Sequence, residues 1–159
     1  SIKDNSSLYV ENIANTFTIN PTKGMKMAPT SVSWTGINLG NTNVLASNNI
    51  TINNTANANL TQVNITGYNL HGTTTTNQFI YAANFSAQIL NLCNGPHVLS
   101  NATNVTLTNA SITPGNHSAG TIAQRQVAFC LEAIEGAGGS LAVQTYDTSN
   151  SFPWRINVN

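Results

Sequence analysis

Charged side chains are scarce in this chain of 159 residues, which holds five Lys plus Arg and five Asp plus Glu. They make up 6% of the sequence, against about 25% in typical soluble domains. The net charge is zero and no basic patch is present, which argues against nucleic acid as a partner. With so few titrating groups, little folding stability is tied to pH. We therefore expect a protein that tolerates acid.

Long apolar runs are also missing. No stretch of 18 apolar residues occurs, so we expect no membrane span in the mature chain. No signal-peptide pattern is present, and the chain begins at Ser1, which fits either a processed product or a trimmed chain. Apolar residues still make up 40%, and this content and length suit one folded domain.

Constellations of catalytic or metal-binding residues are absent from the sequence. Glu132 and Glu135 are the closest acidic pair, but on a strand their odd spacing places them on opposite faces, which predicts solvated surface side chains. The histidines lack metal-ligand spacing, the acids are too few for a calcium cage, and there is neither a phosphate loop nor a nucleophile elbow. We expect no enzyme, cofactor or metal. The other acids are Asp4, Glu11 and Asp147, and the histidines are His71, His97 and His117.

Asn, Ser and Thr are abundant instead, and they form ten Asn-x-Ser/Thr sequons, the acceptor pattern for N-linked sugar. A random order of the 26 Asn and 34 Ser plus Thr would give about 5.6, so the excess is about twofold. Nine sequons lie between Asn49 and Ser118. The acceptors are Asn5, Asn49, Asn53, Asn59, Asn64, Asn84, Asn101, Asn104, Asn109 and Asn116.

The middle residue is apolar in seven of the ten sequons. On a strand, residues i and i+2 share a face and i+1 points the other way, so the middle residue would enter the core while Asn and Thr face water. The pattern predicts half-buried strands that carry sugar. A polar β-surface rich in Asn and Thr is the alternative. Asn64, Asn84 and Asn104 are the best predicted acceptors, and Asn53 is weaker because its middle residue, Asn54, offers no apolar anchor.

Cys93 and Cys130 are the two cysteines. Because sequons suggest an extracellular context, we interpret the pair as one disulfide; two separate buried thiols are the alternative.

Period-two alternation indicates nine or ten short strands with turn signals between them. The clearest runs without a break over residues 78–93, another covers 122–134, and one is expected over 30–39. The pattern predicts an all-β fold: an antiparallel β-sandwich of jelly-roll or Ig-like Greek-key type.

The N-terminal segment stands apart from this pattern. Residues 7–20 alternate with Tyr9, Ile13, Phe17 and Ile19 on one face, and a Pro- and Gly-containing stretch over 20–29 follows as a linker. We expect residues 1–22 to form an extension and residues 23–159 the sandwich body. The segment can either pair within its own domain or leave it to pair with the open edge of a neighbour, as a donor strand.

Low charge, a sequon-bearing β-body and a donor-like N-terminal strand together resemble extracellular filament subunits of archaea, most closely the thread filaments of Sulfolobus-type acidophiles. The chain is more distantly similar to archaeal bundling pili and related bacterial biofilm fibres. The resemblance covers composition and layout over the whole chain, without a specific motif. It implies a head-to-tail homopolymer at the cell surface, covered with N-glycans, that serves adhesion or biofilm.

Other classes fit parts of the sequence. A surface-layer protein or a viral capsid protein can have the same all-β pattern. A carbohydrate-binding module would need an exposed aromatic platform, for which the candidates, Trp34, Tyr68, Tyr81, Tyr146 and Trp154, are more simply core residues.

Overall fold

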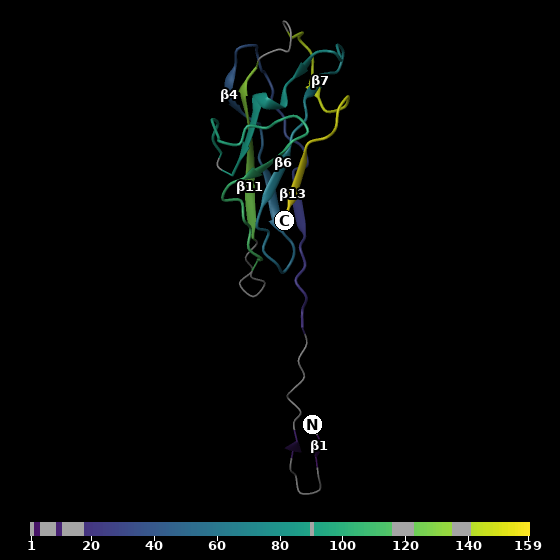
Figure 1. Ribbon diagram of the computed structural model, residues 1–159, viewed down its shortest axis with the longest axis vertical. Helices are drawn as coiled ribbons and strands as arrows, with labels where there is room; N and C mark the ends of the chain where they lie inside the picture. The colour runs from purple at the N-terminus through teal and green to yellow at the C-terminus, as the bar shows by residue number, and fades with distance from the viewer. Residues whose placement is uncertain (1, 4–8, 11–17, 90, 116–122, 135–140) are drawn as a thin grey trace.

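The regular secondary structure of the described residues is almost all β, as predicted. The computed structural model describes residues 2–3, 9–10, 18–89, 91–115, 123–134 and 141–159 (Figure 1). In chain order the elements are β1 (Ile2–Lys3), β2 (Tyr9–Val10), β3 (Met25–Ala28), β4 (Thr42–Leu45), β5 (Ile50–Asn54), β6 (Val63–Thr66), β7 (Leu70–Gly72), β8 (Phe79–Ile80), the 3₁₀ helix η1 (Ala82–Asn84), β9 (Phe85–Gln88), β10 (Asn104–Leu107), β11 (Gln124–Ala133), β12 (Tyr146–Asp147) and β13 (Arg155–Val158).

The longest strand, β11, organises the first sheet, whose order is β3-β5-β11-β4. Strands β4 and β5 follow each other along one side of β11, because Cys130 lies opposite Leu45 and Val127 lies opposite Ile50. Strand β9 pairs with the other side, where Ala128 lies opposite Gln88. All these pairings are antiparallel.

A second antiparallel sheet, β10-β6-β13, and a small sheet, β12-β7-β8, belong to the same body, and β1 and β2 form a separate two-stranded sheet. Figure 1 shows β6 and β13 running side by side, with β11 beside them. Alternate residues of both main sheets, among them Ile52, Ile65 and Phe129, are buried in a common hydrophobic cluster. This arrangement confirms the all-β, sandwich-like fold.

An aromatic group fills the centre of this core. The ring of Phe85 lies 5.0 Å from Trp34 and 5.1 Å from Trp154, and Phe129 lies 5.8 Å from Trp154. Each indole N–H donates to a backbone oxygen, that of Trp34 to Val44 and that of Trp154 to Tyr68. The two tryptophans can therefore be partly buried without an unpaired donor.

Several predicted strands differ from the observed ones. The strand predicted over 78–93 is divided by η1, which shifts the alternation: Ile80 and Ala82 are buried, whereas Tyr81 is exposed. No strand forms over 30–39, although Val32 and Trp34 pack against the core. The stretch predicted as a linker contains β3, which pairs with β5. Side-chain burial therefore follows tertiary packing rather than simple alternation.

The described part of the N-terminal segment joins the body near Asn20. Asn57 accepts from Thr22 N–H at 2.7 Å and donates to Asn20 O at 3.2 Å. N-terminal to this contact, residues 18–20 are exposed, and Figure 1 shows residues 18–24 leading away from the sandwich. Strand β2, which contains Tyr9, pairs with β1. Ile13 and Phe17 lie outside the described residues.

Candidate functional site

The predicted burial of the sequon middle residues is largely confirmed. Five of the seven apolar ones are buried, and Val105 is half-buried. Ala102 is the exception, because it is exposed in a turn with a φ of 57°. The sequons thus lie mostly on half-buried backbone that holds the acceptor positions in place. The five buried residues are Ile50, Leu60, Ile65, Phe85 and Ala110.

Two sequons lie directly opposite each other on neighbouring strands. In the β10–β6 pairing, Asn104 lies opposite Thr66 and Thr106 opposite Asn64. The Thr106 hydroxyl donates to Asn64 Oδ1 at 2.6 Å, and the Thr66 hydroxyl lies 3.4 Å from Asn104 Oδ1. Each sequon therefore uses its threonine to contact the acceptor of the other sequon.

The two acceptors of this pair differ in exposure. Asn104 lies on an edge strand and is exposed, whereas Asn64 lies on the central strand and is only 3% exposed. The prediction that Asn64 faces water is wrong. Asn64 lies between Thr106 of β10 and Asn157 of β13, which leave its side chain little accessible surface.

Asn54, judged from the sequence to give no anchor, is a buried polar residue with three hydrogen bonds. Its amide nitrogen donates to Ala58 O at 2.8 Å and to Ile112 O at 3.1 Å, and its oxygen accepts from Ala56 N–H at 3.0 Å. The neighbouring acceptor, Asn53, is half-buried, and its Oδ1 is buried without a hydrogen-bond partner. Asn54 therefore anchors this sequon through polar contacts, which periodicity does not detect.

The other acceptors vary in accessibility. Asn49 and Asn84 are half-buried, and Asn84 ends η1 with further contacts. Ser86 of the same sequon is buried, contrary to its predicted outward position. Asn5 and Asn116 lie outside the described residues. The exposed acceptors are Asn59, Asn101, Asn104 and Asn109.

The predicted disulfide between Cys93 and Cys130 is confirmed, with the Cα atoms 5.4 Å apart. Cys130 is one residue out of phase with Val127 and Phe129, so alternation places it on the less apolar face of the strand, yet it is 1% exposed. The disulfide joins β11 to the segment that follows β9. Gln88 also donates to Leu92 O in that segment. The loop held in this way covers the less apolar face of β11 at Cys130.

Glu132 belongs to the same contact region and is half-buried, so its predicted role as a solvated surface residue is wrong. Its carboxylate accepts from the Ser86 hydroxyl and, with both oxygens at 3.1 Å, from Asn94 N–H. Glu135 lies outside the described residues. This carboxylate has a structural role: it ties the loop after β9 to β11.

Hydrogen bonds from Ser149 alter the proton affinity of Asp147. The Ser149 hydroxyl at 2.6 Å and the Ser149 N–H at 2.8 Å both donate to Asp147 Oδ1. These bonds favour the ionised form and hold the pKa of Asp147 below its ordinary value of 3.8, while burial opposes the shift. The local geometry is that of a turn stabilised by a carboxylate.

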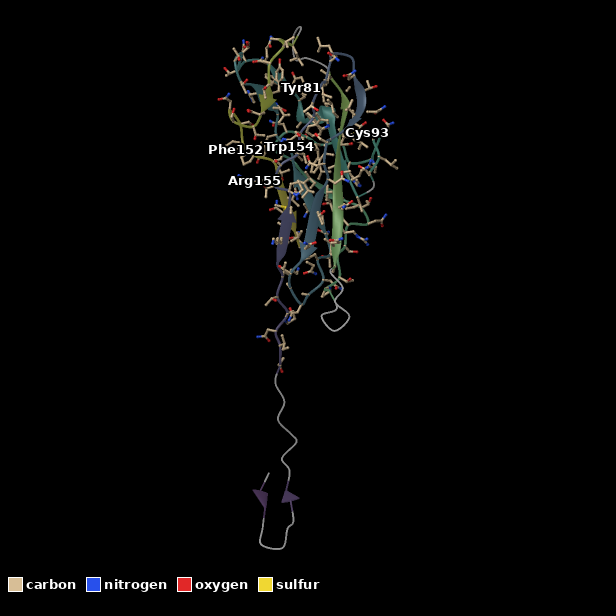
Figure 2. The ribbon with its side chains drawn as sticks, turned by 180° about the vertical axis from the view of Figure 1, so that it is seen from behind. Tyr81, Cys93, Phe152, Trp154 and Arg155 are labelled. Atoms are coloured by element: carbon tan, nitrogen blue, oxygen red, sulfur yellow. A yellow bond between two sulfur atoms is a disulfide. The ribbon has the colours of Figure 1, made fainter. Side chains whose placement is uncertain are left out.

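The described histidines and aromatic side chains make local contacts. His71 Nδ1 lies 3.1 Å from Thr76 O, and His97 Nε2 accepts from Thr108 N–H at 3.1 Å. Tyr81 is 41% exposed and meets Phe79 edge-on at 86°. The exposed Phe152 lies apart from Tyr81 in Figure 2, so these two rings form no flat platform.

Among the described residues, no group of three or more His, Cys, Asp or Glu side chains is arranged to hold a metal ion. No helix in these parts of the chain is long and apolar enough to span a membrane. Comparisons with protein-family models, with curated proteins and with solved structures found no match.

Proposed function

We propose that this chain is the structural subunit of an extracellular, N-glycosylated filament in which the N-terminal segment of one copy completes the sandwich of the next. The observation that carries the proposal is the exposure of residues 18–20, which lie N-terminal to the main-chain hydrogen bonds of Thr22 and Gly24 with the body. Ile19, a large apolar residue, is 69% exposed. An apolar face outside its own core calls for a partner surface.

Sheet chemistry supports the same proposal. The sandwich has open strand edges, which soluble proteins otherwise protect against uncontrolled pairing. A strand supplied by a second copy satisfies an edge through main-chain hydrogen bonds. Because donor and acceptor are different surfaces, such contacts are heterologous and propagate as open filaments.

Glycans at the exposed sequons support the extracellular assignment. Asn59, Asn101, Asn104 and Asn109 have accessible side chains on a body with little surface charge. Sugar at these positions would supply the solubility that surface charge supplies in other proteins. A disulfide in the same domain fits an oxidising compartment. Adhesion or biofilm formation is the proposed role of such a filament, and no catalytic role is proposed.

Removal of residues 1–22 tests the proposal. The full chain is expected to form filaments under negative-stain imaging, whereas the truncated chain is expected to fold, with or without a peptide of residues 7–20, and to stay monomeric. Normal filaments from the truncated chain would refute the donor role. A lattice or a closed shell from the full chain would instead favour a surface-layer or capsid protein.

A matched pair of substitutions sharpens this test. Ile13→Asn with Phe17→Asn removes two apolar side chains from the proposed donor face and should abolish filaments. Thr16→Ala with Thr18→Ala alters the opposite face and should leave assembly intact. Equal assembly by both variants would contradict a donor strand that binds through its apolar face.

A further inference from the structure

The first sheet contains a gap beside β11. Strand β5 covers one side of Gln124–Val127. Strand β9 covers the other side of β11 only from Ala128 onward, because it ends at Gln88. In the described part of the chain, no strand pairs with that other side of Gln124–Val127. This edge of β11 lies in line with β9, and a strand that extended β9 would pair with it.

Hydrogen-bond alternation identifies the main-chain groups at this edge. Asn54 N–H donates to Ala123 O at 2.9 Å, so Ala123 and the residues in phase with it, Arg125 and Val127, bond toward β5. Gln124 and Gln126 are out of phase, so their main-chain N–H and C=O groups point to the open side.

The opposite wall of the gap comes from the second sheet. Ile112 exchanges two main-chain hydrogen bonds with Leu60, at 2.8 and 2.9 Å. By the same alternation, the main-chain groups of Ser111 and Thr113 turn away from Leu60. A hollow of about 160 Å³ lies between the two walls and is lined by both. Its lining residues are Ser111, Ile112, Thr113, Gln124 and Arg125.

A second hollow, of about 290 Å³, lies where β9 ends. A cavity of about 150 Å³ is enough to hold a benzene ring, so this hollow has room for an aromatic side chain. Of all the lining side chains, Arg125 alone carries a full charge. The lining residues are Gln88, Ile89, Pro96, His97, Thr108 and Asn109.

We infer that this gap, the β11 slot, bounded by Gln124–Val127 and by residues 111–113, is the acceptor site for residues 7–20 of a second copy of this chain. The inference rests on the proposed filament function and adds the site at which the donor binds. A strand in the slot would meet outward main-chain groups on both walls. It would therefore join β11 of the first sheet to residues 111–113.

Side-chain chemistry favours this occupant. Residues 7–20 alternate with apolar side chains, two of which, Tyr9 and Phe17, are aromatic. Their single charged residue is the acidic Glu11, and the slot carries the basic Arg125. The charges of donor and slot are therefore opposite in sign, and the slot has space for an aromatic ring.

Proline substitution at the slot provides the test. Gln126→Pro removes an N–H that points to the open side and leaves the β5 ladder complete, which edge strands tolerate. We expect a folded protein that forms no filaments, whereas Gln126→Ala, which keeps the N–H, assembles normally. Met27→Pro on the free edge of β3 is also expected to assemble. Loss of filaments in Met27→Pro together with normal assembly of Gln126→Pro would overturn the inference.

Amide hydrogen exchange on the unmodified chain keeps the test decisive if Gln126→Pro fails to fold. The Gln124 and Gln126 amides should exchange at least about tenfold more slowly in filaments than in the monomeric truncated chain. Equal exchange rates would overturn the slot, even if truncation still abolished assembly and so supported the filament function. Absence of filaments from the full chain would instead refute the proposed function itself.

Discussion

The Thr106 hydroxyl donates a 2.6 Å hydrogen bond to Asn64 Oδ1 across the β10–β6 pair. This contact places two sequons in mutual register and buries one of the two acceptors. A sequon is a linear pattern, but its accessibility is a property of the sheet.

We predict that Asn104 carries sugar and Asn64 does not. A glycan on Asn64 would need a side chain that is 3% exposed to leave its place between Thr106 and Asn157 of the two neighbouring strands, whereas Asn104 lies exposed on an edge strand. Glycopeptide mapping of native material checks this, with Asn104→Gln as the control that should lower the glycan mass. Full occupancy at Asn64 would contradict the prediction.

Reduction of Cys93–Cys130 should lower the free energy of unfolding by about 3–4 kcal/mol in the chain-entropy model, since the bridge spans 37 residues. Denaturant titration of the oxidised and reduced protein measures the difference. The Cys93→Ala, Cys130→Ala double variant is the control, because its unfolding midpoint should not change when reductant is added. An unchanged midpoint after full reduction would rule out a stabilising role.

Asn54→Ala should cost about 1–3 kcal/mol, because it removes three hydrogen bonds that a buried side chain makes to the main chain. The substitution keeps the Asn53 sequon, so the glycan does not confound the measurement. Asn59→Ala, at an exposed position, is the control, expected to change stability by less than about 0.5 kcal/mol. Both are compared by thermal unfolding of unglycosylated protein; equal effects would show that the Asn54 bonds add little.

The melting temperature should change little between neutral pH and about pH 4, because few groups titrate. The pKa of Asp147 is lowered in the folded state, so its stabilising contribution is present above the ordinary value of 3.8 and is lost as pH falls through the lower folded pKa. Asp147→Ala should therefore be less stable than the parent at pH 7 and equal to it in stronger acid. A constant difference at every pH would exclude Asp147 as the source.

The predictions for β11 and the disulfide are confirmed, whereas that for residues 78–93 is not. Strand β11 was predicted almost in full, since Val127, Phe129 and Leu131 alternate within it and are buried in the core. The disulfide was also predicted, from an even pair of cysteines. The strand over 78–93 failed, because its alternation continues through η1, where the chain turns and the buried phase shifts to Ile80 and Ala82.

The sequence by itself determined the fold class, the low charge and the positions of the sequons, because strand periodicity and residue type are local properties. Only the tertiary structure decided that Asn64 is buried and Glu132 half-buried, that Asn54 anchors a sequon, and that β9 ends where it leaves the β11 slot. Each of these depends on which distant segment packs against the strand. Alternation along a strand specifies two faces, but the residues that cover a face come from elsewhere in the chain.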